Sequence, residues 1–327
     1  MHLPRPGSRR TAAVDGALPW LAALPWATWA ALRLSGQERG YPLVPALAFT
    51  PHAAGAALLP LGLAVRARSW GAAALAAVAG GALAVAVLDR AGGGAPPAPA
   101  GVGLRLATVS LRLGLADACD VVALVRRHAV DVLAVQELTP AAEARLATAG
   151  LGALLPHAHV VRARPGSVPS ASGGVWSRLP VRERGTVPGH FEQPTVRLEV
   201  PGGRDVEVTA VHTVPPLRPS WTRAWAADLD GLPAPEQEPL RVLAGDFNAT
   251  LDHAALRAVL RRGYRDAACA VGRGLAATWR PLRLGRPRLP LDHVLVDPRI
   301  AVAAVDLVPV RGSDHRALVV DLVVPAG

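Results

Sequence analysis

The chain has 327 residues, which allows one large domain or two smaller ones. Hydrophobic residues make up 51% of it and charged residues 18%, a balance too apolar for a disordered protein and high for an ordinary soluble enzyme. The two cysteines exclude a disulfide-based scaffold. All 35 basic residues are arginines and the formal net charge is +10, which favours anionic partners such as phosphate esters or lipid head groups.

Three apolar stretches, at 17–32, 41–65 and 71–88, occupy the first 90 residues. Because about 20 apolar residues cross a bilayer, we expect three transmembrane helices. The third stretch has no polar side chain and is the clearest, whereas the second contains four prolines, which membrane helices tolerate when their neighbours satisfy the freed carbonyls. A cleaved signal peptide is the alternative for the first stretch.

The arginines that flank these stretches predict an orientation, because cytoplasmic loops of membrane proteins are enriched in basic residues. Five arginines lie on the side of the N-terminus and three on the opposite side: Arg5, Arg9, Arg10, Arg66 and Arg68 against Arg33, Arg39 and Arg90. We therefore expect a multi-pass protein of the cell membrane with its N-terminus inside and all residues after 90 outside the cytoplasm.

Residues 91–100 are rich in Gly and Pro and read as a linker, which leaves 101–327 as one domain. Its predicted strands are 104–111, 131–138, 173–181, 195–200, 205–213, 239–249, 291–297, 301–310 and 315–324. Its predicted helices are 116–130, 220–232, with Ser220 as N-cap, and 251–262. The first two strands and their helix form a β-α-β unit, and 195–213 forms a hairpin. This mixture predicts an α/β fold, a two-sheet α/β sandwich with outer helices.

Polar side chains interrupt the apolar strands near their ends, where a rigid scaffold presents catalytic groups. They are Glu137, His212, Asp246, Asn248, Asp292, Asp314 and His315. Asp246 and Asn248 are two positions apart, so a strand would direct both to one face. Each residue taken alone is more often a surface or capping residue, and only the set as a whole indicates a site.

In chain order these residues form Gln136-Glu137, His212, Gly245-Asp246-Phe247-Asn248, Thr278-Trp279, Asp292-His293 and Ser313-Asp314-His315. The pattern resembles the endonuclease/exonuclease/phosphatase superfamily of metal-dependent phosphodiesterases and phosphatases, over essentially all of 101–327. The only Asn of the chain falls within it, which indicates that this amide is required. The resemblance implies a DNase I-like fold.

The resemblance also implies roles. Glu137 anchors a divalent ion, Mg²⁺ or alternatively Mn²⁺, in a metal site that Asp314 and Ser110 complete. Asp246 and Asn248 orient the attacking water and hold the phosphate, while His315, oriented by Asp292, balances charge. His212 stabilises the phosphoryl oxygens or protonates the leaving group. Ser110 departs from the family pattern, which has Asn there, and its shorter side chain is expected to weaken a contact within the site.

The expected function is a membrane-anchored phosphoesterase that acts outside the cytoplasm on a lipid-linked phosphate or diphosphate. Its architecture is similar to that of three-span actinobacterial membrane proteins of the teicoplanin-resistance type. A tethered extracellular nuclease is the alternative, although few aromatic residues are available to stack on bases. A non-catalytic relative, weakened at Ser110, is the third hypothesis. Four arginines before Asp292, at 280, 283, 286 and 288, form either a solvated loop or a phosphate contact.

Overall fold

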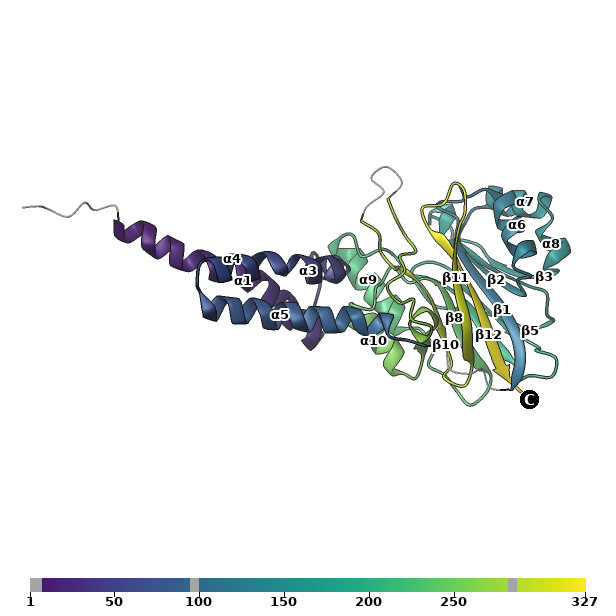
Figure 1. The fold of residues 1–327 in the computed structure, drawn as a ribbon. Helices are drawn as coiled ribbons and strands as arrows, with labels where there is room; N and C mark the ends of the chain where they lie inside the picture. The colour runs from purple at the N-terminus through teal and green to yellow at the C-terminus, as the bar shows by residue number, and fades with distance from the viewer. Residues whose placement is uncertain (1–7, 95–99, 282–286) are drawn as a thin grey trace, which may run out of the picture. The chain divides into compact units, whose positions relative to one another are not determined.

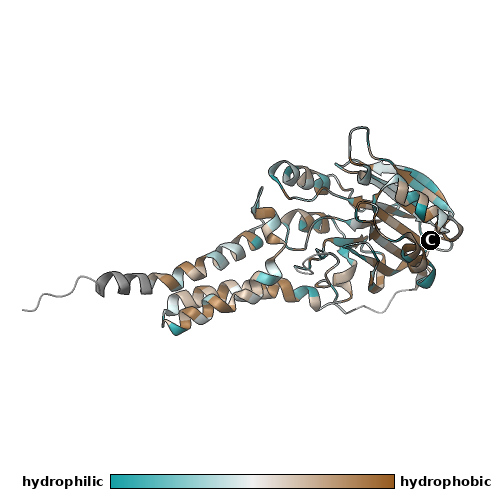
Figure 2. Cartoon of the chain, turned by 90° about the horizontal axis from the view of Figure 1, so that it is seen from above, coloured by the Kyte–Doolittle hydropathy of each residue, from teal (hydrophilic) through white to brown (hydrophobic). Residues whose placement is uncertain are grey.

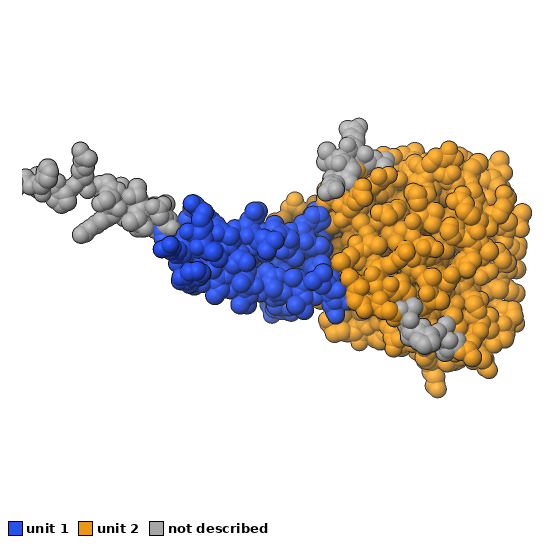
Figure 3. All heavy atoms as spheres, in the orientation of Figure 1, with its two compact units in different colours: residues 1–39, 43–89, 252–254 blue, residues 40–42, 90–251, 255–327 orange. Residues whose placement is uncertain are grey.

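The computed structural model describes residues 8–94, 100–281 and 287–327 (Figure 1). Arg5, Arg283, Arg286 and part of the expected linker 91–100 lie outside these ranges. The chain forms two compact units (Figure 3), one made of 1–39, 43–89 and 252–254, the other of 40–42, 90–251 and 255–327. The proposed boundaries at 90 and 100 remain a prediction.

The first unit is helical. It contains α1 (Ser8–Ser35), α2 (Leu43–Leu47), α3 (Thr50–Ala56), α4 (Leu58–Arg66) and α5 (Trp70–Leu88). Ala30 of α1 packs against Ala79 and Leu83 of α5 in a small apolar cluster. Figure 2 shows hydrophobic residues along these helices as well as within the sheets of the second unit.

The expectation of three membrane-spanning helices is only partly met. Among the described residues, one helix, Trp70–Ala91, is long and apolar enough to cross a membrane, judged by length and composition alone. The stretch 41–65 is not one helix but the three short helices α2, α3 and α4. Its prolines explain the breaks between these helices, because proline lacks an N–H and its ring clashes with the carbonyl four residues earlier. Proline is tolerated in the first turn of a helix, which is where Pro51 lies in α3.

The second unit contains two six-stranded sheets. The first has the order β11-β12-β1-β2-β4-β3 and the second β5-β6-β7-β8-β10-β9. The strands of the first sheet are β1 (Gly101–Ser110), β2 (Val132–Leu138), β3 (His157–Val161), β4 (Ser172–Ser177), β11 (Ala301–Pro309) and β12 (Arg316–Pro325). Those of the second are β5 (Val181–Val187), β6 (Gln193–Leu198), β7 (Val206–His212), β8 (Leu240–Asp246), β9 (Arg265–Asp266) and β10 (Asp292–Val296).

Each sheet has one parallel pair, β1 with β2 and β7 with β8, and its other pairs are antiparallel. Apolar side chains from both sheets fill the space between them, for example Leu106, Leu318, Val208 and Val242. The predicted two-sheet sandwich, its β-α-β opening and its hairpin are therefore confirmed.

Helices cover the outer faces. The outer face of the first sheet packs against α6 (Ala118–Arg127), α7 (Pro140–Thr148) and α8 (Leu151–Leu154). Beside the second sheet lie α9 (Pro219–Asp230) and α10 (Ala254–Arg261) (Figure 1), while α11 (Ala267–Ala270) packs on the core between the sheets. The predicted N-cap Ser220 is wrong: α9 begins one residue earlier, with Pro219 in its first turn and Arg218 at the cap. Proline is preorganised for that position and outcompetes the serine.

The predicted strand 173–181 is also wrong at its end. β4 stops at Ser177, whose hydroxyl accepts a hydrogen bond from the Leu179 amide at 2.9 Å, and β5 begins at Val181 in the other sheet. A serine side chain that binds the backbone two residues on competes with strand pairing. The chain therefore changes sheets at Arg178–Pro180.

Candidate active site

The topology gathers the candidate residues at one edge of the sandwich. Ser110, Glu137, His212 and Asp246 lie at or near the carboxyl ends of the parallel strands β1, β2, β7 and β8. The antiparallel partners β12 and β10 begin at this edge, so that Asp292 pairs directly with Asp246 and His315 precedes β12. Side chains separated by up to about 200 positions in the chain thus meet in one place.

Glu137 occupies an irregular position in β2. The ladder between β2 and β4 shifts register between Val135 and Leu138, and Glu137 has a φ of 54°, in the left-handed region. A β-bulge of this kind redirects a side chain, and non-glycine residues in that region are strained and concentrate at functional sites. The Leu113 amide donates a hydrogen bond to Glu137 Oε2. The backbone therefore fixes the direction of this carboxylate.

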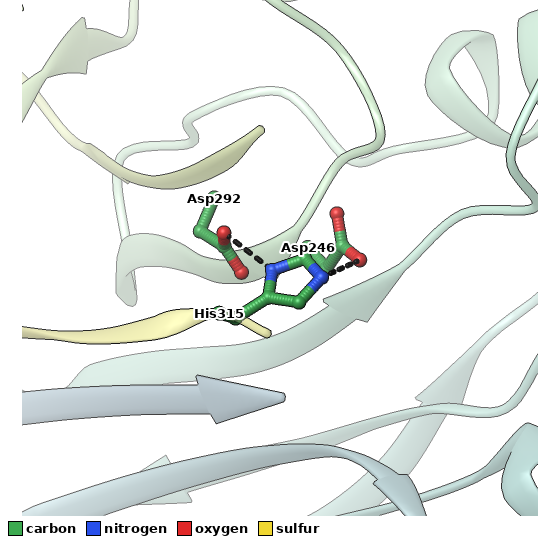
Figure 4. Close-up of side chains that lie close together, drawn as sticks. All are labelled: Asp246, Asp292 and His315. Atoms are coloured by element: carbon green, nitrogen blue, oxygen red, sulfur yellow. Dashed lines mark hydrogen bonds and ion pairs between the residues drawn. The ribbon is translucent and has the colours of Figure 1, made fainter. Parts of the chain in front are cut away.

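Asp246, Asp292 and His315 form a buried cluster (Figure 4) whose ligand atoms all lie within 4.8 Å of one another. His315 Nδ1 is 2.8 Å from Asp292 Oδ2, and His315 Nε2 is 3.8 Å from Asp246 Oδ2. The imidazole thus stands between two carboxylates and is oriented by Asp292.

Burial and proximity perturb the charges of this cluster. Burial raises the pKa of Asp246 to about 8, with neighbouring Asp292 and Glu137 adding to the rise and His315 opposing it. Burial lowers the pKa of His315, but Asp292 and Asp246 outweigh it and raise this pKa to about 10. Burial also raises the pKa of Glu137. The site therefore concentrates more carboxylate than one imidazolium can balance, which is the setting that a bound cation stabilises.

His212 is buried beside this cluster. Burial, with the positive His315 as a smaller cause, lowers its pKa to about 3. Its ring lies on that of Phe191, with centroids 4.5 Å apart, and its Nδ1 has no hydrogen-bond partner among the described residues. His212 is therefore a neutral imidazole at physiological pH with one ring nitrogen still available.

The remaining predicted residues are held by backbone and side-chain contacts. The Asn248 amide N–H donates to Asp246 Oδ1 at 2.9 Å, and its side-chain Nδ2 donates to the Thr213 carbonyl at 2.9 Å. Asp314 accepts a hydrogen bond from Trp279 Nε1 at 3.1 Å. Thr278 Oγ1 accepts from the Asp292 amide at 3.0 Å. The Thr-Trp pair thus supports both aspartates.

His293, adjacent to Asp292, lies outside the cluster. Its Nδ1 is 2.7 Å from Asp266 Oδ2 and its Nε2 is 2.9 Å from the Ala249 carbonyl. Both ring nitrogens are satisfied within the core, so that His293 has a structural role.

Ser110 is fully buried, and within the described part of the chain its Oγ has no hydrogen-bond partner. Its carbonyl accepts a hydrogen bond from Ser313 Oγ at 2.8 Å, and Ser313 Oγ in turn accepts from the His315 amide at 3.0 Å. The structure thus links the Ser110 backbone to His315, whereas a metal role for its hydroxyl stays a prediction.

Gly245 shows why glycine precedes Asp246. A Cβ there would lie 2.0 Å from the Val211 carbonyl oxygen and 2.9 Å from Gln136 Nε2. Only glycine permits this close approach of β7 and β8 beneath the site.

Sequence reasoning missed three contributors: the Leu113 amide on Glu137, the Thr213 carbonyl on Asn248, and the Phe191 ring on His212. Two of them act through the backbone and therefore leave no residue-type signal. Phe191 follows no strand end and carries no polar group, so that no pattern singled it out.

The donor set fits a divalent metal ion. Carboxylate oxygens from Glu137 and Asp246 are the ligands that hard cations prefer, and both carboxyl groups are reluctant to ionise without a cation nearby. The hydroxyl of Ser110 and the Nδ1 of His212 are buried polar atoms without a partner in the described structure, as is usual where a ligand is missing.

The sandwich and its acidic edge define a phosphoesterase-type fold. The chain belongs to the endonuclease/exonuclease/phosphatase family, whose model matches residues 107–315. Members of this family are hydrolytic phosphoesterases that depend on divalent metals. No curated protein matches the chain.

Solved structures share the fold. The endonuclease/exonuclease/phosphatase from Beutenbergia cavernae DSM 12333 is 22% identical, with a TM-score of 0.54 over 68% of this chain and 72% of that one. A humanized D. rerio TDP2 with 14 mutations is 14% identical, with a TM-score of 0.54 over 67% and 98%. D. rerio TDP2 complexed with single strand DNA product is also 14% identical, with a TM-score of 0.52 over 67% and 98%. At these identities the likeness shows the architecture alone.

Proposed function

We propose that this protein is a membrane-anchored, divalent-metal-dependent phosphoesterase that acts outside the cytoplasm on a lipid-linked phosphate or diphosphate. The observation that carries the hydrolytic part is the His315–Asp292 pair beside Asp246, buried at the edge where Glu137 also lies. The apolar helix α5 and the preceding apolar segments support the membrane part.

Glu137 is the residue that would anchor the metal, Mg²⁺ by preference and Mn²⁺ as an alternative, and Asp314 and Ser110 would complete its site. A bound divalent ion neutralises charge on phosphoryl oxygens and positions the phosphate.

The chain's own groups perform the remaining tasks. Asp246 is fixed by the Asn248 amide and is placed to orient the attacking water and accept its proton. His315, kept protonated by Asp292 and Asp246, offers positive charge to the phosphoryl group. His212, neutral at physiological pH because burial lowers its pKa to about 3, serves as a hydrogen-bond partner of the phosphate more readily than as a proton donor to the leaving group.

A tethered nuclease is the second candidate, favoured by the fold that this chain shares with the TDP2–DNA complex. A non-catalytic relative would require the Ser110 substitution to have abolished turnover.

One substrate panel distinguishes these hypotheses. Full-length protein in nanodiscs with Mg²⁺ would be given polyprenyl diphosphate, phosphatidylinositol phosphate, sphingomyelin, single-stranded DNA and plasmid DNA, and product release would be measured. We expect turnover of a lipid phosphate and none of DNA. Faster cleavage of DNA would favour the nuclease, and no turnover of any substrate would favour the non-catalytic relative.

A further inference from the structure

The second unit carries an open groove of about 860 Å³. It lies between the loop that follows β1 and the helices α6 and α7. Small aliphatic side chains make up much of its lining, among them Leu115, Ala118, Ala144 and Ala149. None of the residues that we placed in the catalytic cluster lines it, so the groove has no role in the function proposed above.

The groove begins where the catalytic edge ends. Leu113, whose amide holds Glu137, is two residues from Leu115 on the groove wall, and the lining residue Gly312 directly precedes the Ser313 that binds Ser110. The loop that binds Glu137 and the segment that precedes Ser313 thus also form walls of this groove.

The loop presents apolar side chains beside a carboxylate. Leu113 and Leu115 are 59% and 61% exposed. Arg112 and Leu113 have φ values of 48° and 54°, in the left-handed region that non-glycine residues rarely adopt. The loop is nevertheless fixed, because the Leu115 amide donates to the Arg112 carbonyl at 3.0 Å and the Arg145 guanidinium donates to the Gly114 carbonyl. A fixed, strained loop that binds Glu137 through the Leu113 amide and exposes Leu113 and Leu115 is suited to hold an apolar group.

The charges of the groove do not suit a nucleic acid backbone. Arg311, on its wall, is paired with Asp120 at 2.8 Å and with Asp117 at 3.3 Å. Arg145, on the other wall, is engaged by the Gly114 carbonyl. Binding of a phosphate backbone requires arginines or lysines that are available to phosphates. Because alanine and leucine line the walls and the arginines are already paired, the groove favours binding of a hydrocarbon chain over binding of a nucleic acid backbone.

We propose that this groove binds the hydrocarbon tail of an amphiphilic phosphate ester whose phosphate occupies the Glu137–Asp246 site. The inference rests on the proposed function, because it takes the ligand to be a phosphate ester. It adds that the substrate is selected by its tail. Each methylene buried in the groove should strengthen binding about fourfold.

Cys119 provides a reporter, since it lines the groove and is exposed, and the second cysteine, Cys269, can be replaced by serine. We would measure the alkylation rate of Cys119 by N-ethylmaleimide in the full-length Cys269→Ser protein, in nanodiscs with Mg²⁺. The probes are methylphosphonate, octylphosphonate, dodecylphosphonate, inorganic phosphate and a single-stranded oligonucleotide. Phosphonates are not hydrolysed, so the assay reports binding separately from turnover.

We expect dodecylphosphonate to protect Cys119 at a concentration at least 100-fold lower than methylphosphonate, as burial of several methylenes implies. Leu115→Ser should raise the protecting concentration about tenfold, the effect of losing one buried aliphatic side chain. Ala144→Trp, at an exposed position that fills the groove, should remove the dependence on chain length. Val168→Ser, at an apolar residue that is 55% exposed and does not line the groove, is the matched control and should change nothing.

Equal protection by methyl- and dodecylphosphonate, or none by either, would overturn the proposal that the groove binds a hydrocarbon tail, even if the protein hydrolyses phosphate esters. Protection by the oligonucleotide in place of the alkyl probes would assign the groove to nucleic acid. Protection that depends on chain length in a protein without turnover would leave the groove standing and overturn the proposed hydrolysis.

Discussion

Replacing Asp292 by Asn tests the electrostatic core of the site with little change of shape. His315 Nδ1 lies 2.8 Å from the Asp292 carboxylate, and the pKa of His315 is about 10 because Asp292 and Asp246 outweigh the effect of burial. Loss of one carboxylate at this distance should lower that pKa by about 1–3 units, which weakens the imidazolium by about 1.4–4 kcal/mol. If the imidazolium stabilises the transition state, kcat/KM should fall by about 10- to 1000-fold.

The assay is the initial rate of phosphate ester hydrolysis between pH 5.5 and 10 at a fixed Mg²⁺ concentration. We expect the alkaline limb of the Asp292→Asn profile to move by about 1–3 units toward acid, in addition to the loss of rate. Its thermal midpoint without metal should fall, because the folded state loses the carboxylate that stabilises the protonated His315.

The structure provides a matched control in a second buried Asp–His pair. His293 Nδ1 lies 2.7 Å from Asp266 Oδ2, in the core beside β9. Asp266→Asn should therefore lower the thermal midpoint and leave the pH–rate profile unchanged. A native rate and pH profile in Asp292→Asn, or an equal loss of activity in both variants, would refute an electrostatic role of Asp292.

Four further outcomes are expected. Without metal, stability should fall as pH rises above 6.5, because Asp246, with its pKa raised to about 8, and His315, with its pKa raised to about 10, each keep a proton in the folded state that the unfolded chain loses, at up to about 1.4 kcal/mol per pH unit each; below pH 6.5 the Asp246 slope is opposed by His212, whose pKa is lowered to about 3, chiefly by burial, and whose contribution is lost as pH decreases. Thermal midpoints in EDTA that rise between pH 6.5 and 8 would contradict this. Glu137→Gln should abolish turnover stimulated by Mg²⁺ without lowering the midpoint in EDTA, because burial already disfavours the charged carboxylate; retained turnover would exclude it as a ligand. Ser110→Asn should raise kcat/KM about tenfold, or about 1.4 kcal/mol, and Ser110→Ala should lower it; a neutral alanine variant would show that the hydroxyl does not contribute. A C-terminal alkaline phosphatase fusion should be active and a green fluorescent protein fusion dark, and the reverse would place the second unit in the cytoplasm.

Much of the fold could be predicted because the apolar pattern of a strand, and the polar residues at its end, are properties of residues that are adjacent in the sequence. The strand at 239–249 and the hairpin at 195–213 are marked by apolar runs and turn residues, and the structure contains β8 and the β6–β7 pair there. The strand-end positions of Asp246 and Glu137 follow from the same patterns. That Asp246 and Glu137 meet at one edge depends on the order of the strands in the sheets. The sequence indicated this order only through the resemblance of its motifs to the family.

The rest depends on interactions that residue types do not encode. The bulge that redirects Glu137 arises from pairing with β4, and its hydrogen bond comes from a backbone amide at Leu113. The switch of sheets after Ser177 depends on one side-chain contact that competes with a strand pattern. In the apolar segment 41–65, hydropathy predicted a span, whereas proline geometry produced three short helices.

We propose above that the acidic edge is a metal-dependent phosphoesterase centre. The most direct test is to measure the rate of phosphodiester hydrolysis by the full-length protein while EDTA is replaced by increasing concentrations of Mg²⁺. We expect no turnover in EDTA, a saturable rise with Mg²⁺, and no rise in the Asp246→Asn variant. The same rate in EDTA as in saturating Mg²⁺, or an undiminished response in Asp246→Asn, would contradict it.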